Sequence, residues 1–337
     1  MTVRVGINGF GRIGRSFYRA LLARGADAGV DLVAVNDPMG DSNTMAFLLK
    51  HDSVGGTLRH EVKASDTGFS VDGREVRKLE VMDPAEIPWA DQGVDVVIES
   101  TGLFTSREKA AGHLQGGAKR VLISAPSSDA DVTICLGVND QVYDPASHTV
   151  VSGASCTTNC LAPLAKVLDD RFGIERGLMT TVHAYTNDQR VLDLPHRDLR
   201  RARAAAVNLI PTSTGAARAI GLVLPQLQGR LDGTALRVPT PTGSITDLTA
   251  QLGAAATSDD VNAAFAAAAN DPSYRGVLEY SDEPLVSADI VGNPASCVFS
   301  AHDTMSTGNL VKVLGWYDNE WGYSNRLVDL VAFVEAS

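Results

Sequence analysis

A glycine-rich turn near the beginning of the chain constrains the fold more than any other feature. Gly9, Gly11 and Gly14 follow a short β-branched run in a G-x-G-x-x-G spacing that opens into a helical pattern. A second apolar run, residues 31–37, ends in Asp37. Glycines so spaced let the backbone approach a pyrophosphate, which the free N–H groups of a helix N-terminus bind, while an acidic residue accepts hydrogen bonds from a ribose. The order strand, glycines, helix, strand and Asp therefore predicts a dinucleotide-binding unit.

Asp37 also indicates which dinucleotide this turn would bind. A carboxylate at this position repels a 2′-phosphate. Its neighbours Asn36 and Pro38 carry no cation that could offset the repulsion. We therefore expect NAD rather than NADP as the cofactor.

Strand-like and helix-like segments alternate through the first part of the chain. Apolar runs at 95–102 and 120–127 end in small or turn residues, and a helix-compatible stretch at 106–117 separates them. From about residue 155 the runs become long and alternating, at 177–186, 235–252 and 310–319, which favours antiparallel strands with one half-buried face. We therefore expect an α/β chain: a doubly wound domain, then an α+β domain with a mainly antiparallel sheet.

Charge and hydropathy exclude two classes of partner as the main role. Acidic side chains number 40 against 29 basic ones, a net charge of −11, which disfavours nucleic-acid binding. No run of roughly 20 apolar residues could span a membrane, and no basic segment followed by an apolar one begins the sequence. We therefore expect a cytoplasmic protein that binds neither nucleic acid nor a membrane.

The four cysteines are too few for a disulfide framework, so each needs its own explanation. Cys156 lies among hydroxyl residues at an expected helix start, where free N–H groups and the helix dipole favour a thiolate. Cys160, four positions later, could form half of a metal site or an oxidation-prone pair with it, but no further ligand spacing follows and no metal is expected. Cys135 and Cys297 lie in apolar runs and are expected to be buried.

Seven sequence blocks resemble one enzyme family in order and spacing. They are GINGFGRIG, SCTTNC, HAYTNDQ, HRDLRRARAAA, PTSTGAA, RVPTP and WYDNEWGYSNR, and they extend over essentially the whole chain. On these motifs the chain resembles the phosphorylating, NAD-dependent glyceraldehyde-3-phosphate dehydrogenases of glycolysis. The resemblance also distinguishes His183 from the six other histidines, because a lone histidine on a strand is usually a satisfied polar residue.

The resemblance implies a domain organisation and a chemistry. It implies a Rossmann NAD-binding domain at 1–155, completed by a C-terminal helix at 319–337, a catalytic domain at 156–318, and a homotetramer. Cys156 would be the nucleophile and His183 its activating acid/base. Glyceraldehyde 3-phosphate would be oxidised through a hemithioacetal and a thioacyl-enzyme, and inorganic phosphate would release 1,3-bisphosphoglycerate.

Binding residues follow from the same motif matches. NAD would contact Gly9, Gly11, Arg12, Ile13, Gly14, Asp37, Met82, Thr101, Ser124 and Asn319. The substrate phosphate would lie on Thr186 and Arg237, inorganic phosphate on Ser155, Thr157, Thr214 and Gly215, and Arg201 would reach both. Met82 departs from the family, which often has a basic residue there, so only a main-chain cofactor contact would survive. The pair Leu194–Pro195 accompanies NAD use in the family.

Two rival functions remain at this point. A related aldehyde dehydrogenase that hydrolyses its thioester would share the fold, the cysteine and the histidine, although a second anion site at Thr157, Thr214 and Gly215 favours phosphate as the acceptor. A non-catalytic NAD-binding or nucleic-acid-binding protein on this scaffold is disfavoured by the Cys–His pair and the negative charge. A cysteine hydrolase without a cofactor does not account for the dinucleotide turn.

Overall fold

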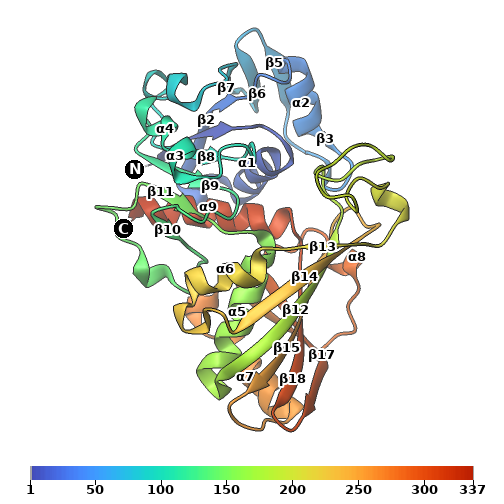
Figure 1. The fold of residues 1–337 in the computed structure, drawn as a ribbon. Coiled ribbons are helices and arrows are strands. Elements are labelled where there is room, and N and C mark those ends of the chain that lie inside the picture. Colours follow the sequence, from blue (N-terminus) through green and yellow to red (C-terminus); the bar gives the residue numbers. More distant parts are fainter. Residues whose placement is uncertain (1, 337) are drawn as a thin grey trace. The chain divides into compact units, whose positions relative to one another are not determined.

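The computed structural model describes residues 2–336, which divide between two compact units. Unit 1 comprises Met1–Ile134, Gln141–Ala154 and Leu327–Ser337, and unit 2 comprises Cys135–Asp140 and Ser155–Arg326. Each unit is built around its own sheet (Figure 1).

The sheet of unit 1 has the strand order β10-β11-β9-β8-β1-β2-β7-β6-β5. All pairs from β10 through β7 are parallel, and only the edge pairs β7–β6 and β6–β5 are antiparallel. This confirms the doubly wound sheet predicted from the sequence. The strands are β1 (Val3–Asn8), β2 (Val30–Asn36), β5 (Val62–Ser65), β6 (Gly68–Val71), β7 (Arg74–Leu79), β8 (Val96–Glu99), β9 (Arg120–Ile123), β10 (Val132–Thr133) and β11 (Val150–Ser152).

Helices and a small hairpin complete unit 1. The apolar face of the first helix is buried at Phe17, Ala20 and Leu21, whereas Ile13 at its first turn is only half-buried. The predicted helix at 106–117 is present as two short helices. The elements are α1 (Arg12–Arg24), α2 (Ser42–Lys50), α3 (Arg107–Ala110) and α4 (Gly112–Gln115), with the hairpin of β3 (His51–Asp52) and β4 (Gly56–Thr57).

The three glycines of the turn between β1 and α1 differ in their surroundings. Gly9 has φ +90°, and a Cβ there would lie 2.8 Å from the Thr101 nitrogen. A Cβ on Gly14 would lie 2.6 Å from the Gly9 carbonyl oxygen, so this position brings helix and strand together. Gly11 has no protein atom within 4 Å of such a Cβ, so nothing in the protein itself demands a glycine there.

The sheet of unit 2 has the order β13-β14-β12-β15-β18-β17-β16 and is mainly antiparallel, as predicted. The pairs β12–β14 and β16–β17 are parallel. Helix α5 packs on β12, β15, β17 and β18, α6 on β14, and α7 on β16 and β17. The strands are β12 (Ile174–Ala184), β13 (Ile210–Ser213), β14 (Leu231–Val238), β15 (Ser244–Leu252), β16 (Leu278–Ser281), β17 (Cys297–Thr307) and β18 (Leu310–Tyr317). The helices are α5 (Cys156–Phe172), α6 (Ala216–Val223), α7 (Ser258–Ala269), α8 (Ser287–Ile290) and α9 (Trp321–Ala336).

Helix α9 starts in unit 2, but its residues from Leu327 onward belong to unit 1. Its apolar stripe, Leu327, Leu330, Val331 and Val334, is buried. Polar contacts add to this packing, because Arg24 pairs with Asp329 and Arg120 pairs with Glu335 at 2.6 Å. A segment distant in sequence therefore forms part of the core of unit 1.

The ion pair of Arg12 with Asp52 predicts a pH-dependent contribution to stability. Burial would raise the pKa of Asp52, but hydrogen bonds from Arg12 at 2.7 Å and from the Gly55 and Val54 N–H groups outweigh it and lower the pKa to about 2. This pKa lies below the unfolded value of about 3.9, so the stabilisation is complete above about pH 4 and is lost as the pH falls through 2.

Asp52→Asn is expected to lower the free energy of unfolding at neutral pH by about 1 kcal/mol, allowing for solvent screening. The difference from the unmodified protein should shrink as the pH falls below about 4. Urea unfolding at neutral pH, pH 4 and pH 3 measures it, with Asp66→Asn, an exposed carboxylate, as the control. A difference that stays constant across this range would contradict the assignment.

Candidate active site and cofactor-binding turn

Cys156 is the first residue of α5, as the sequence predicts. Ser155 caps the helix, because its side-chain oxygen accepts the Thr158 N–H at 3.0 Å. Behind it, Leu161, Leu164 and Leu168 are fully buried and fix the helix on the sheet. The thiol is half-buried at this helix N-terminus.

His183, near the end of β12, is buried and faces Cys156. Its Nε2 lies 3.5 Å from the Cys156 Sγ, and its Nδ1 lies 2.6 Å from the Ala184 carbonyl oxygen. The carbonyl oxygen can only accept, whereas the Arg237 Nη1, 3.0 Å from the same nitrogen, can only donate. The shorter contact is the one with the carbonyl, which favours a proton on Nδ1 of the neutral ring. The lone pair of Nε2 is therefore directed at the thiol, where it can accept a proton.

Arg237, on β14, shares the same carbonyl. Its Nη1 donates to the Ala184 oxygen at 3.0 Å and lies 3.4 Å from the Thr186 hydroxyl. Its Nε is buried without a hydrogen-bond partner, and no carboxylate among residues 2–336 lies within ion-pair distance of this guanidinium. Arg237 and Thr186 thus form a cationic corner suited to an anion.

The surroundings of Cys156 and His183 favour the uncharged form of each side chain. Burial raises the pKa of Cys156, although the Arg237 charge and the Thr157 hydrogen bonds lower it. Burial and the Arg237 charge together lower the pKa of His183. The thiolate bias predicted from the helix start is thus outweighed by burial, and the resting pair is a thiol beside a neutral imidazole.

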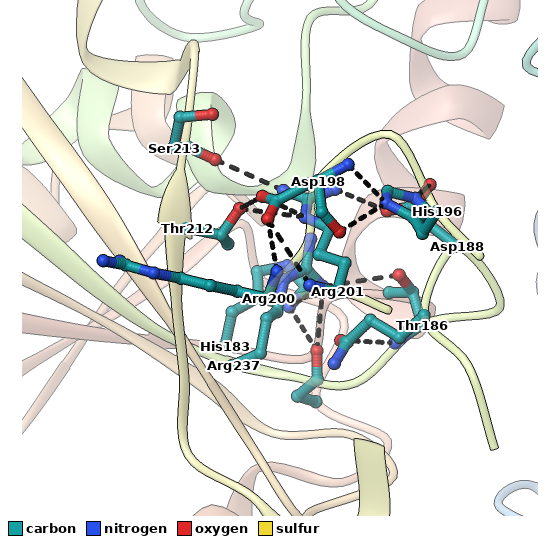
Figure 2. Close-up of polar contacts among 12 residues, drawn as sticks. His183, Thr186, Asp188, His196, Asp198, Arg200, Arg201, Thr212, Ser213 and Arg237 are labelled. Carbon is teal, nitrogen blue, oxygen red and sulfur yellow. Dashed lines mark hydrogen bonds and ion pairs between the residues drawn. The ribbon is translucent and has the colours of Figure 1, made fainter. Parts of the chain in front are cut away.

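Arg201 is held by a polar cluster, which Figure 2 shows around its guanidinium. It contacts the Asp188 carboxylate at 2.5 Å, and its Nε donates to the Thr212 hydroxyl at 3.0 Å. The Thr212 hydroxyl in turn donates to Asp198 at 2.6 Å, and His196 lies 3.4 Å from Asp188. Arg201 is therefore fixed in direction by residues that the sequence analysis did not single out.

The remaining candidates of the second anion site lie on two helix starts. The Thr157 hydroxyl is buried and lies 2.8 Å from the Tyr317 hydroxyl, which is also 2.7 Å from Thr181. Thr214 and Gly215 open α6, where the Thr214 hydroxyl accepts the Ala216 N–H at 3.2 Å. Thr157 hydrogen-bonds to Cys156. Within the described part of the chain, Thr214 and Gly215 form no hydrogen bond with Cys156, His183 or Arg237.

The cofactor candidates of unit 1 gather at the carboxyl ends of parallel strands. Asp37 follows β2 and accepts the Phe10 N–H at 2.9 Å and the Met39 N–H at 2.9 Å. The N–H groups of Arg12, Ile13 and Gly14 lie in the first turn of α1 and precede the Arg15 N–H, which donates to the Gly11 carbonyl at the start of the helix. A side chain on Gly11 would enter open space beside these donors, so the site fits a pyrophosphate.

The other cofactor candidates differ in their surroundings. Met82 is 72% exposed, which agrees with a main-chain role only. Thr101 is bonded to Glu99, and the Ser124 hydroxyl donates to the Glu99 carbonyl at 3.0 Å. In unit 2, Asn319 is buried, and the Ser244 hydroxyl donates to its side-chain oxygen at 2.8 Å, which fixes the direction of the amide.

The other cysteines do not contribute to this site. Cys135 and Cys297 are buried, as predicted, and Cys160 is buried with its Sγ 3.4 Å from the Gly315 carbonyl. Within residues 2–336, no cluster of histidine, cysteine and acidic side chains is suited to a metal ion. In the same part of the chain, no helix is long and apolar enough to cross a membrane.

The sequence did not point to Tyr317, Asp188 and Thr212. These residues hydrogen-bond to other site residues: Tyr317 to Thr157, and Asp188 and Thr212 to Arg201. Asp188 carried one signal, since it lies two positions after Thr186 in the HAYTNDQ block. Thr212 and Tyr317 carried the same signal, since Thr212 lies two positions before Thr214 in the PTSTGAA block and Tyr317 two positions before Asn319 in the WYDNEWGYSNR block. Their hydrogen-bond partners are distant in sequence, so the blocks alone did not show what they contact.

Known proteins match the chain along nearly its whole length. The NAD binding domain of glyceraldehyde 3-phosphate dehydrogenase matches residues 3–107, and the C-terminal domain of the same enzyme matches residues 155–319. A glyceraldehyde-3-phosphate dehydrogenase of Streptomyces coelicolor is 62% identical over 335 residues, which cover 99% of each chain. One from Mycobacterium avium is 61% identical over 341 aligned positions, which cover both chains completely. The chain therefore belongs to the glyceraldehyde-3-phosphate dehydrogenase family.

Proposed function

We propose that the chain oxidises glyceraldehyde 3-phosphate to 1,3-bisphosphoglycerate with NAD and inorganic phosphate, as a glycolytic enzyme. The observation that carries the proposal is the 3.5 Å contact of the Cys156 Sγ with a His183 nitrogen whose lone pair faces it. Family membership makes the chain an NAD-dependent dehydrogenase. We assign residues 1–155 with 319–337 to the NAD-binding domain and 156–318 to the catalytic domain.

Acylation begins when His183 accepts the thiol proton at Nε2 as the sulfur attacks the aldehyde carbon. A C–S bond forms and the C=O π bond breaks, and the imidazolium, stabilised by the Ala184 carbonyl through Nδ1–H, gives the proton to the former carbonyl oxygen, which becomes the hydroxyl of a hemithioacetal. His183 is then neutral again. His183 then takes the hydroxyl proton as the carbon loses hydride, which leaves a thioester on Cys156. NAD, when bound, supplies the acceptor for that hydride.

The arginines and hydroxyl side chains of the site would bind two anions. Arg237 and Thr186 would hold the substrate phosphate, because the guanidinium has no carboxylate partner of its own among the described residues. Ser155, Thr157, Thr214 and Gly215 would hold inorganic phosphate, with Arg201 reaching both. Phosphate oxygen then attacks the thioester, the C–S bond breaks, and the thiolate leaves. This second site favours phosphorolysis over the hydrolytic alternative.

Exposed apolar side chains in unit 2 support a homotetramer. An open groove on unit 2 is lined by the exposed Leu178 and Leu310 together with charged and polar side chains, among them Arg176 and Asp247. Exposed apolar side chains surrounded by polar ones often mark a protein interface. We propose that copies of the chain bind one another there, and that the enzyme acts in the cytoplasm with no nucleic acid or membrane as its main partner.

His183→Asn is expected to slow alkylation of Cys156 by iodoacetamide about 100-fold at neutral pH, because no lone pair then accepts the thiol proton. Rates of label incorporation measure the effect. Cys156→Ser should take up no label at this site and should lose turnover while it still binds NAD. His196→Asn, which leaves the Cys156 contact intact, is the matched control. An alkylation rate equal to that of the unmodified protein would remove His183 from the mechanism.

Asp37→Asn is expected to lower the ratio of kcat/KM for NAD to that for NADP by about tenfold. The amide oxygen keeps an acceptor for the Phe10 N–H, whereas the charge that repels a 2′-phosphate is lost. Asp37→Gly should narrow the gap as well but weaken NAD binding, because it removes that acceptor. An unmodified enzyme that prefers NADP would contradict the cofactor assignment.

Thr214→Val is expected to convert steady turnover into a burst of one NADH per Cys156, followed by a slow phase that phosphate accelerates. The lost hydroxyl removes one hydrogen bond to the incoming phosphate, which costs roughly 1.5–3 kcal/mol. Rapid-mixing absorbance resolves the two phases, and Thr214→Ser, which keeps the hydroxyl, should behave like the unmodified enzyme. If the unmodified enzyme turns over equally fast without phosphate, the hydrolytic function replaces the proposed one.

A further inference from the structure

A buried polar network lies at the carboxyl ends of three neighbouring parallel strands in unit 1. β1, β2 and β8 end in Asn8, Asn36 and Glu99, which are 3%, 1% and 2% exposed. His113, at the short helix α4, is fully buried against Glu99. The mechanism proposed above uses none of these four side chains.

Glu99 is the centre of the network. Its Oε2 accepts the Asn8 amide at 2.7 Å and lies 2.9 Å from the His113 Nε2. Its Oε1 accepts the Thr101 N–H at 2.9 Å and also the Thr101 hydroxyl. A carboxylate can accept at both oxygens in this way, whereas a neutral amide in its place presents only one accepting oxygen.

Trp89 fixes the protonation of His113. The indole N–H, which can only donate, lies 3.0 Å from the His113 Nδ1, so Nδ1 is the acceptor of the neutral ring. The ring proton must then be on Nε2, where it is donated to Glu99. Trp89 is itself fully buried, so the whole chain from indole to carboxylate is closed off from water.

Asn8 and Asn36 extend the network to the other two strands. The Asn36 amide donates to the Asn8 side-chain oxygen at 2.7 Å. Asn36 also accepts the Val81 N–H at 2.8 Å and donates to the Val81 carbonyl at 2.9 Å. One set of hydrogen bonds thereby joins six separate segments of unit 1, those of Asn8, Asn36, Val81, Trp89, Glu99 and His113.

Four of these segments carry a proposed cofactor residue close to the residue that belongs to the network. Asn8 precedes Gly9, Asn36 precedes Asp37, Val81 precedes Met82, and Glu99 bonds to Thr101. The Ser124 hydroxyl donates to the Glu99 carbonyl. Buried charges contribute little net stability compared with well-packed apolar side chains, so stability does not explain this carboxylate. Its geometric effect is to fix the direction of the strand ends.

We infer that Glu99 and His113 are positioning residues for NAD, which hold the glycine turn, Asp37 and the Thr101 loop in one binding-ready arrangement. The inference rests on the proposed cofactor site and deepens it. Neither side chain touches the cofactor in this proposal, because both lie buried behind the residues that do. The hydrogen bonds from Trp89 to His113 and from His113 to Glu99 can be kept or removed by substitution, which makes the inference testable.

His113→Leu and His113→Gln form the matched pair that tests this inference. Glutamine keeps one N–H for Glu99 and one oxygen for the Trp89 N–H, whereas leucine keeps neither. We expect His113→Leu and Glu99→Gln each to raise the Kd for NAD roughly tenfold. His113→Gln should stay within about threefold of the unmodified protein. Titration calorimetry measures the Kd, and steady-state rates should show a raised KM for NAD with an unchanged KM for the aldehyde.

Two controls separate positioning from general damage. Val97→Ala, in the buried core of the same strand β8, should lower the thermal midpoint without changing the Kd for NAD. The rate of Cys156 alkylation should stay unchanged in the His113 variants, because that thiol lies in unit 2. If Val97→Ala weakens NAD binding as much as His113→Leu, the network has a structural role only.

Gly11→Val separates failure of this inference from failure of the proposed cofactor site. A side chain there meets no protein atom within 4 Å of its Cβ, so the fold should persist while pyrophosphate is blocked. If Gly11→Val abolishes NAD binding and both His113→Leu and Glu99→Gln leave it unchanged, the network does not position the cofactor. If Gly11→Val leaves NAD binding unchanged, the proposed cofactor site itself is wrong.

The tautomer of His113 can be measured in the unmodified protein. Nitrogen-15 NMR of histidine-labelled protein should show His113 neutral with its proton on Nε2, the signal being assigned by its loss in His113→Gln. Trp89→Phe removes the N–H that enforces this state and should allow the other tautomer to appear. A proton on Nδ1 in the unmodified protein would overturn the donor–acceptor order on which the inference depends.

Discussion

Parallel strand pairing in unit 1 decides where its functional groups lie. Because β1 pairs in parallel with both β2 and β8, the carboxyl ends of all three strands meet at one edge of the sheet. Backbone donors of the α1 first turn and the Asp37 carboxylate are brought to that edge by strand direction alone. The same geometry leaves polar side chains buried at the strand ends, and each must find its partners within the protein. A dinucleotide turn and a closed hydrogen-bond network are thus two results of one topology.

Unit 2 brings its chemistry together through a different device. Cys156 starts a helix, whereas His183 and Arg237 lie opposite each other on the parallel pair β12 and β14. The carbonyl of Ala184 serves both side chains as an acceptor. It therefore favours a proton on the His183 Nδ1 and also accepts a hydrogen bond from the guanidinium. One backbone oxygen thus contacts both the proton acceptor His183 and the guanidinium of the cationic corner.

The sequence predicted the architecture well because local patterns and motif order carry that information. Gly9, Gly14 and Asp37 lie where the turn pattern placed them, and Cys156 begins a helix as its flanking hydroxyl residues indicated. The protonation state of the thiol was misjudged, because burial outweighs a helix N-terminus and burial comes from distant segments. Asp188, Tyr317 and Glu99 were overlooked for a related reason: their effect is exerted through partners that only the folded sheets bring near. Motifs identify the groups that meet ligands, whereas the groups that orient them have no comparable pattern.

The division of α9 between the two units has a consequence for how the chain folds during synthesis. Most of unit 1 is translated before Ser155, yet its core also needs Leu327, Leu330 and Val334, which are translated after the whole of unit 2. Until then the apolar surface that receives this stripe stays exposed to water. Unit 2 has no such requirement, since its residues from Ser155 to Arg326 are continuous and its other segment, Cys135–Asp140, precedes them. The core of unit 1 can therefore be completed only after unit 2 has been synthesised.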